Sequence, residues 1–143
     1  MWWQAPRAVR TVAVGTVLVL AYGTLVHVAQ LAVAGFAPYP ELPGWLRVYF
    51  VGLTVLDPLA AVLLARGRRS GVVLAVAVLV TDALANGWAN YALDPAGGVT
   101  AGRVGQAVVT ALALTLAVTA PRMWRHAPGS TARPGRSPVG STR

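Results

Sequence analysis

The sequence contains no cysteine and very few acidic residues, only four Asp or Glu in 143. Without cysteine, disulfide bonds, thiolate chemistry and cysteine-ligated zinc or iron–sulfur sites are excluded. Lysine is absent as well, because all twelve basic residues are arginine. Together with the abundance of alanine, valine and glycine, this indicates a GC-rich genome and a bacterial origin.

Charge is scarce in general, since charged residues make up only 11 % of the chain. Hydrophobic residues make up 56 %, and the mean hydropathy is +0.61. A soluble domain of this size cannot bury so much apolar surface. The chain instead has repeated apolar runs of about 20 residues, long enough to cross about 30 Å of hydrocarbon as helices. We therefore predict an all-α integral membrane protein.

Four apolar segments are separated by short polar or proline-rich breaks. The segments cover residues 12–35, 47–65, 71–93 and 102–120, and the breaks read FAPYPELPGW, RGRRS and DPAGG. The first segment is too long for the core of a typical signal peptide, so we interpret it as a retained helix. We expect a four-helix bundle over residues 1–126 and a disordered basic tail over residues 127–143.

The arginines predict the orientation in the membrane. On one side of the predicted bilayer lie Arg7, Arg10, Arg66, Arg68, Arg69, Arg122, Arg125, Arg133, Arg136 and Arg143, and on the other lie Arg47 and Arg103. The positive-inside rule then places both termini in the cytoplasm of a multi-pass protein of the bacterial inner membrane. Because these arginines flank apolar runs and no nucleic-acid-binding motif accompanies them, we expect the lipid bilayer as their partner and no nucleic acid.

Two of the few acidic residues lie inside apolar segments, Asp57 in LTVLDPLAAVLL and Asp82 in VLAVAVLVTDALANGWANY. At 1.5 Å per helical residue, both fall near the bilayer midplane. An ionised aspartate there costs at least about 2.5–3.5 kcal/mol. Polar contacts between membrane helices typically contribute only about 0.6 kcal/mol, so hydrogen bonding between helices, the structural alternative, explains them poorly. With no basic residue at that depth, we expect at least one of them to be protonated and to act as a catalytic acid.

Other polar and aromatic side chains are placed to line a pocket around these acids. Asn86 and Asn90 follow Asp82 at i+4 and i+8, so the three form a polar stripe along one helix face. The remaining candidates for binding or orienting a substrate are His27, Gln30, Tyr22, Tyr49, Trp88 and Gln106. For His27, a neutral ring bonded to a carbonyl or to Gln30 is the alternative to a base. Glu41 is a candidate lid residue, and we expect no metal site, since the His and Asp spacing is nonspecific.

A neutral carboxylic acid in an apolar pocket suits a substrate that dissolves in the membrane and forms a carbocation, such as a prenyl alkene or epoxide. Aromatic faces stabilise such cations, and the candidates are Tyr22, Tyr49, Phe50, Trp88 and Tyr91. Trp88 lies roughly opposite the Asp82 stripe, so a lipid-facing position is the alternative for it. Asp57, Asp82 and the Asn86/Asn90 stripe, in a small four-span chain without an aspartate-rich magnesium motif, resemble the small integral-membrane terpene cyclases of bacterial indole-terpenoid (meroterpenoid) pathways. The resemblance covers the four-span region. It implies an isomerase that cyclises an apolar prenylated or epoxidised substrate by Brønsted-acid initiation, with no cofactor.

Two other functions are consistent with the same residues. Paired midplane acids are also expected in a proton-coupled transporter of small molecules. Four spans would have to pair in a homodimer to form such a pathway, and the small residues of GRVGQAVVTALA would allow close packing. The third alternative is a non-catalytic assembly partner in the membrane, which would tolerate Asp→Asn changes at both positions.

Overall fold

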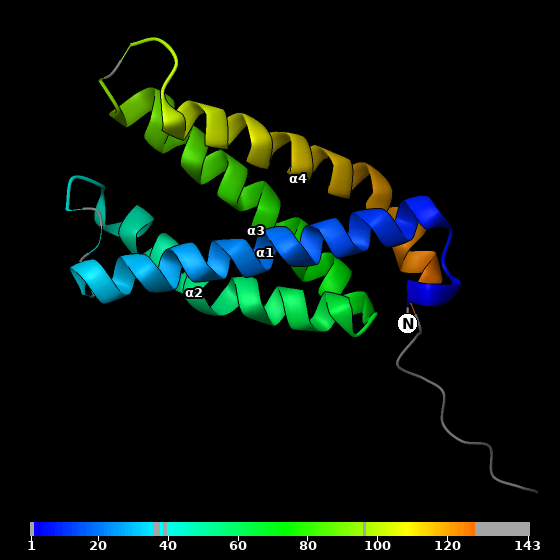
Figure 1. Cartoon of the computed structure of the whole chain (residues 1–143). Helices are drawn as coiled ribbons and strands as arrows, with labels where there is room; N and C mark the ends of the chain where they lie inside the picture. The colour runs from blue at the N-terminus through cyan, green and yellow to red at the C-terminus, as the bar shows by residue number, and fades with distance from the viewer. Residues whose placement is uncertain (1, 36–37, 39, 96, 128–143) are drawn as a thin grey trace, which may run out of the picture.

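The computed structural model describes residues 2–35, 38, 40–95 and 97–127, and these residues form helices joined by short connections (Figure 1). The elements in order are η1 (Trp2–Gln4), α1 (Arg7–Ala34), α2 (Gly44–Ala65), α3 (Arg69–Trp88), η2 (Ala89–Leu93) and α4 (Ala101–His126). The segment η2 is a π-helical continuation of α3. Four helices are long and apolar enough to cross a membrane. The all-α class and the four predicted spans are therefore confirmed, and no strand occurs in the described residues.

The helix starts follow from local sequence signals. Pro6 and Pro43 directly precede the first residues of α1 and α2, where a fixed φ suits helix entry and no backbone N–H is needed. Thr100 caps α4, and its hydroxyl accepts a hydrogen bond from the backbone N–H of Arg103 at 3.2 Å. These signals place the start of α1 five residues before the apolar segment itself.

Two prolines lie inside helices. Pro58 lies within α2 and Pro121 within α4. Each proline lacks the backbone N–H that a regular helix would use, which leaves one carbonyl oxygen without its helical partner. An apolar environment offers no water to backbone groups, so the remaining helical hydrogen bonds are kept and the helix continues on both sides of the proline. The sequence places the end of the fourth span near residue 120, whereas α4 extends through Pro121 to His126.

Each helix packs against the next one along the chain, and the first and last helices have few contacts with each other. Neighbouring helices α1 and α2, α2 and α3, and α3 and α4 have extensive contacts, whereas α1 and α4 contact each other far less. Figure 1 shows α3 and α4 diverging from α1 and α2 toward the end that holds the α1–α2 and α3–α4 connections. We call this the loop end, and the opposite end, with the α2–α3 connection, the arginine end.

The arginine end is the tightly packed half of the bundle. Leu64, Val72, Leu116 and Met123 are almost completely buried there. The indole N–H of Trp2 donates a hydrogen bond of 2.6 Å to the carbonyl oxygen of Leu64, which ties η1 to the end of α2. Along the whole bundle many large apolar side chains point outward, as expected of helices that face lipid.

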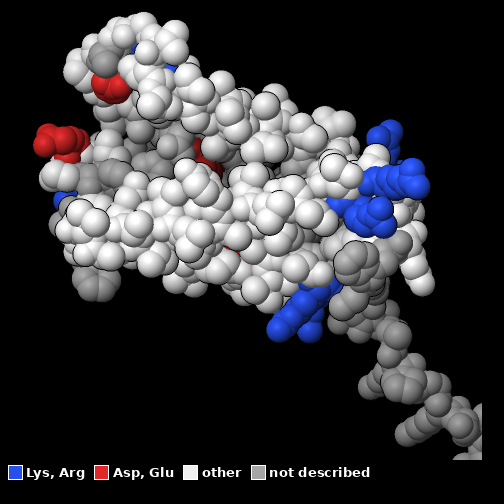
Figure 2. Space-filling view, in the orientation of Figure 1, with Lys and Arg blue, Asp and Glu red and all other residues white. Residues whose placement is uncertain are grey.

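Charge separates along the bundle axis. Blue basic atoms gather at the right of Figure 2, at the arginine end, and acidic loop residues lie at the left. The N-terminus and the end of α4 share the arginine end (Figure 1). The positive-inside prediction requires these arginines to lie at one end of the bundle. Arg133, Arg136 and Arg143 lie outside the described residues, as does most of the predicted disordered tail.

Candidate functional site

A cavity of about 520 Å³ lies where the helix pairs diverge, between the arginine end and the loop end. All four helices contribute to its wall, and Glu41 and Leu42 of the α1–α2 connection reach its outer edge. Figure 2 shows a hollow between the α3–α4 pair and the α1–α2 pair, with acidic atoms visible inside it. The predicted site residues that line this cavity are Tyr22, His27, Gln30, Glu41, Asp57, Asp82, Asn86 and Asn90.

Asp57 lies on the α2 wall and is only 5 % exposed. Its carboxyl oxygen Oδ2 lies 4.0 Å from Nε2 of His27 on α1. This distance is longer than a hydrogen bond, but a small movement of either side chain would close it. The structure therefore pairs Asp57 with an imidazole.

His27 is held by contacts on both sides of its ring. Its Nδ1 lies 3.2 Å from Oε1 of Gln30, one turn further along α1. The ring stacks on Phe50 of α2, with centroids 6.3 Å apart and 24° between the planes. In the tautomer that donates Nδ1–H to the Gln30 amide oxygen, Nε2 is left as a proton acceptor that faces Asp57.

Asp82 has a different partner. The side-chain amide of Asn86 donates to Oδ1 of Asp82 at 2.7 Å and to the Asp82 carbonyl oxygen at 3.1 Å. The amide of Asn90 in turn donates to the carbonyl oxygen of Asn86 at 2.9 Å. The polar stripe expected from the spacing is thus a ladder of hydrogen bonds along α3 and η2. With Oδ1 engaged, a proton on the carboxyl would reside on Oδ2.

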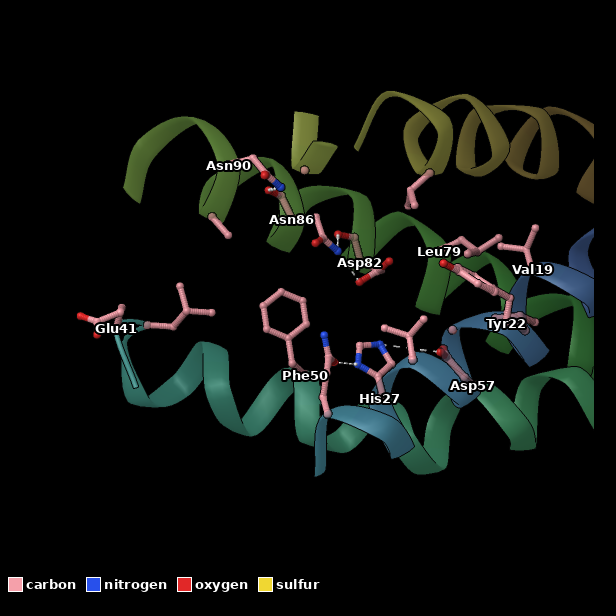
Figure 3. Close-up of a pocket in the computed structure, with 18 residues that line it drawn as sticks. Val19, Tyr22, His27, Glu41, Phe50, Asp57, Leu79, Asp82, Asn86 and Asn90 are labelled. Carbon is pink, nitrogen blue, oxygen red and sulfur yellow. Dashed lines mark hydrogen bonds and ion pairs between the residues drawn. The ribbon is translucent and has the colours of Figure 1, made fainter. Parts of the chain in front are cut away.

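The two acids lie across the same cavity. Figure 3 shows Asn90, Asn86 and Asp82 in a row along one wall, with Phe50, His27 and Asp57 on the other. The two carboxyl groups are close enough to interact electrostatically. In the described part of the chain, no group of three His, Cys, Asp or Glu side chains is placed to hold a metal ion.

Three predicted site residues do not line the cavity. The hydroxyl of Tyr49 lies 2.9 Å from that of Thr81, between α2 and α3. The amide of Gln106 donates to the carbonyl oxygen of Ala83 at 2.6 Å, between α3 and α4. Trp88 is 54 % exposed, because it follows Asn86 by two residues and so lies on nearly the opposite helix face. The predicted roles of these residues in contacting a substrate are not supported by their positions.

Phe50, one of the aromatic candidates for cation stabilisation, lies on the cavity wall beside His27 (Figure 3). Several other cavity residues were not predicted as part of the site, among them the apolar Val19, Leu20 and Leu79. Two glycines also line the cavity, Gly23 on α1 and Gly102 on α4. A glycine in an apolar helix carries no sequence signal of what faces it, so only the packing of α1 on α2 and of α4 on η2 reveals these positions.

The loop end of the cavity is built on the π-helical turn. The backbone N–H of Asp94 donates to the carbonyl oxygen of Ala89 at 3.0 Å, five residues earlier. Arg103 of α4 donates from Nε to the carbonyl oxygen of Asn90 at 3.3 Å and from Nη1 to that of Gly98 at 2.6 Å. These bonds tie the α3–α4 connection to the helix that carries the polar stripe. Turns of π-helix often occur at functional sites.

Comparison with known proteins gives no match, whether with family models, with curated protein sequences or with solved structures. The fold and the site therefore define the class by themselves: a multi-pass membrane protein with a cavity that holds two carboxyl groups among its helices. Any function has to be inferred from the chemistry of that cavity.

Proposed function

We propose that the protein is a membrane-embedded terpene cyclase, which protonates an isoprenoid alkene or epoxide and directs the cyclisation of the resulting carbocation. The observation that carries this proposal is the pair Asp57 and Asp82 in one cavity, each with a different polar partner. A volume of about 520 Å³ is in the range of pockets that enclose a small organic ligand.

Asp82 is the proposed acid. The Asn86 amide donates to Oδ1, so the acidic hydrogen on Oδ2 is available to the cavity. In the first step the O–H bond of Asp82 breaks and a C–H bond forms on the alkene, or an O–H bond on the epoxide oxygen. The Asn86 amide also stabilises the carboxylate that results, since a hydrogen bond to a charged acceptor is stronger than one to a neutral acceptor.

The cavity offers stabilisation for the cation that follows. The faces of Phe50 and Tyr22 lie along its wall (Figure 3), and aromatic rings attract cations through their electron-rich faces. Phe50 is fixed by its stack on His27 and by an edge contact with Tyr49, whose ring centroid lies 5.6 Å away. Tyr49 thus supports the site from outside the cavity.

His27 and Asp57 are the proposed final proton acceptor. Loss of a proton from the cyclised cation breaks a C–H bond and forms an N–H bond on Nε2 of His27, with the Asp57 carboxyl 4.0 Å away to balance the charge. The substrate gains one proton from Asp82 and loses one to His27, so its conversion is a net isomerisation. Transfer of that proton from Nε2 of His27 back to the Asp82 carboxylate, directly or through water, resets the site for the next turnover. The reaction needs neither an oxidant nor a reductant.

The loose α1–α4 contact supplies a route for the substrate. A prenylated molecule dissolved in the bilayer reaches the cavity sideways between these helices, without passing through water. Val19 and Leu79 lie at the deep end together with Tyr22 and Asp57, whereas Glu41 and Asn90 lie toward the loop end (Figure 3). This arrangement orients the chain terminus inward and a polar head group outward, beneath Glu41 as a lid residue.

The arginine distribution supports an orientation for the whole molecule. We place the arginine end in the cytoplasm and the cavity in the opposite half of a bacterial inner membrane. A homodimer is not required by this route, because the cavity lies within one chain. A transporter needs a path to both sides, whereas the cavity stops at its deep end, above the packed arginine end.

The test is product analysis by mass spectrometry on membranes that contain the wild type, Asp57→Asn or Asp82→Asn. Each is given a panel of prenylated and epoxy-prenylated indoles and quinols. The matched control is Asp94→Asn, the same change in a residue outside the cavity. We expect the wild type and the control to form an isomer of unchanged mass and new retention time, and Asp82→Asn to lose it.

No conversion of any panel member by well-folded wild type would contradict the cyclase. Vesicle flux measurements would then separate the rivals. Uptake that depends on a proton gradient and on Asp57 or Asp82 would indicate a transporter. Normal assembly of both aspartate variants without flux would indicate a non-catalytic partner.

A further inference from the structure

Gly23 of α1 lies directly against the carboxyl group of Asp57. A Cβ placed on Gly23 would stand 2.5 Å from Oδ2 of Asp57 and 3.5 Å from its Cγ. The first distance is far below van der Waals contact, so the carboxyl rests on bare backbone of α1. Any other residue at position 23 would have to push it away.

His27 follows Gly23 by four residues, so both lie on the same face of α1. The Asp57 carboxyl is thus in contact with this face at two levels: it packs on Gly23, and its Oδ2 lies 4.0 Å from Nε2 of His27. Asp57 also lines the cavity, so a side chain at position 23 would displace its carboxyl group away from this face of α1.

We propose that Gly23 is a positioning residue, whose missing side chain allows the Asp57 carboxyl to lie beside His27. This role rests on the proposed function in one respect, namely that Asp57 and His27 together accept a proton. The placement of the carboxyl group by Gly23 does not depend on a substrate, since the position of that group can be measured in the free protein.

The same helix contains the control. Gly15 lies two turns earlier on α1, and a Cβ placed there would meet nothing within 4 Å. Gly15 also lies outside the cavity. Gly15→Ala therefore reports the effect of an added methyl group on α1 where no neighbouring side chain has to move.

The first measurement is thermal unfolding of purified Gly23→Ala and Gly15→Ala. Alanine has the higher helix propensity, so Gly15→Ala should keep or raise the midpoint temperature. Gly23→Ala should lower it relative to Gly15→Ala, because the added methyl group has to displace the Asp57 carboxyl. In an Asp57→Ala background, where the carboxyl is gone, the same Gly23→Ala change should no longer lower it. This double variant keeps the test valid if Gly23→Ala alone fails to fold.

The second measurement reports on the carboxyl itself. Infrared spectra at low and high pH contain carboxyl bands of Asp57, identified as those that Asp57→Asn removes. Gly23→Ala should shift these bands, because the group leaves its contact with His27, whereas Gly15→Ala should leave them in place. A merely structural role of Gly23 would lower stability without moving the bands.

Conversion of substrate separates this proposal from the cyclase. If the wild type converts a panel substrate, Gly23→Ala should lower kcat at least tenfold with little change in KM, and Gly15→Ala should match the wild type. Band shifts without conversion by any variant would retain the placement by Gly23 and reject the cyclase. Conversion by the wild type, with Gly23→Ala equal to Gly15→Ala in all three measurements, would overturn the role of Gly23 and leave the cyclase standing.

Discussion

The two ends of the bundle are built from the same four helices and have opposite properties. At the arginine end the side chains are apolar and buried, and Trp2 ties η1 to α2. Toward the loop end the helices separate, and the space between them contains polar groups that an apolar environment disfavours. Packing at the arginine end holds the helices together, and this allows the helices to enclose a cavity toward the loop end. Stability and chemistry should therefore respond to different substitutions.

Asp82→Asn should give the largest effect on chemistry. A positioned acid typically contributes about 10²- to 10⁴-fold to a rate, so we expect a loss of at least about 100-fold in conversion. Unfolding should occur at a similar temperature, because an amide of the same size replaces a carboxyl that is already neutral and keeps an oxygen that can accept from the Asn86 amide. Parallel measurements of turnover and thermal unfolding test both halves of this prediction. Retained turnover would exclude Asp82 as the acid.

Leu64→Ala should have the opposite profile. Leu64 is 0 % exposed at the arginine end, and removing a fully packed leucine costs about 2 kcal/mol or more. Conversion per folded molecule should stay near that of the wild type. Leu18→Ala is the matched control, since Leu18 is 64 % exposed and should change stability by less than about 0.5 kcal/mol. Equal destabilisation by both changes would contradict the view that the arginine end is the packed half.

Asn86→Ala should lower conversion roughly tenfold, because it removes one hydrogen bond to the Asp82 carboxyl. In the Asp82→Asn background the same change should have no further effect, since the two residues act as one unit. Rate measurements on the two single variants and the double variant complete this cycle. Additive losses would show that Asn86 acts on the substrate independently of Asp82.

Trp2→Phe should have the smallest effect. It keeps most of the ring but removes the hydrogen bond to the Leu64 carbonyl oxygen, which is worth about 1 kcal/mol. We expect a slightly lower unfolding temperature and unchanged conversion. A clear loss of conversion would show that the arginine end influences the cavity and would weaken the comparison.

Much of the fold follows from sequence because it depends on apolar length. The four helices, the placement of Asp57 and Asp82 inside the second and third of them, and the i, i+4 spacing behind the Asn86–Asp82 hydrogen bond could all be predicted. Helix rotation could not, since most faces of these helices are equally apolar. That is why Tyr49 and Gln106 were predicted to line the pocket and lie outside it, whereas for Trp88 the spacing from Asp82 already offered a lipid-facing position as the alternative. The contact of Gly23 with Asp57 depends on two rotations at once, and no single residue signals it.

The loose contact between α1 and α4 has a consequence for any assay of this protein. On the proposed route, substrate enters the cavity from the lipid. The reaction rate therefore depends on the mole fraction of substrate in the lipid and does not depend directly on the substrate concentration in the buffer. Adding inert lipid at constant substrate would dilute the substrate in two dimensions and slow an unsaturated reaction in proportion. Rates should therefore be compared at a fixed ratio of substrate to lipid.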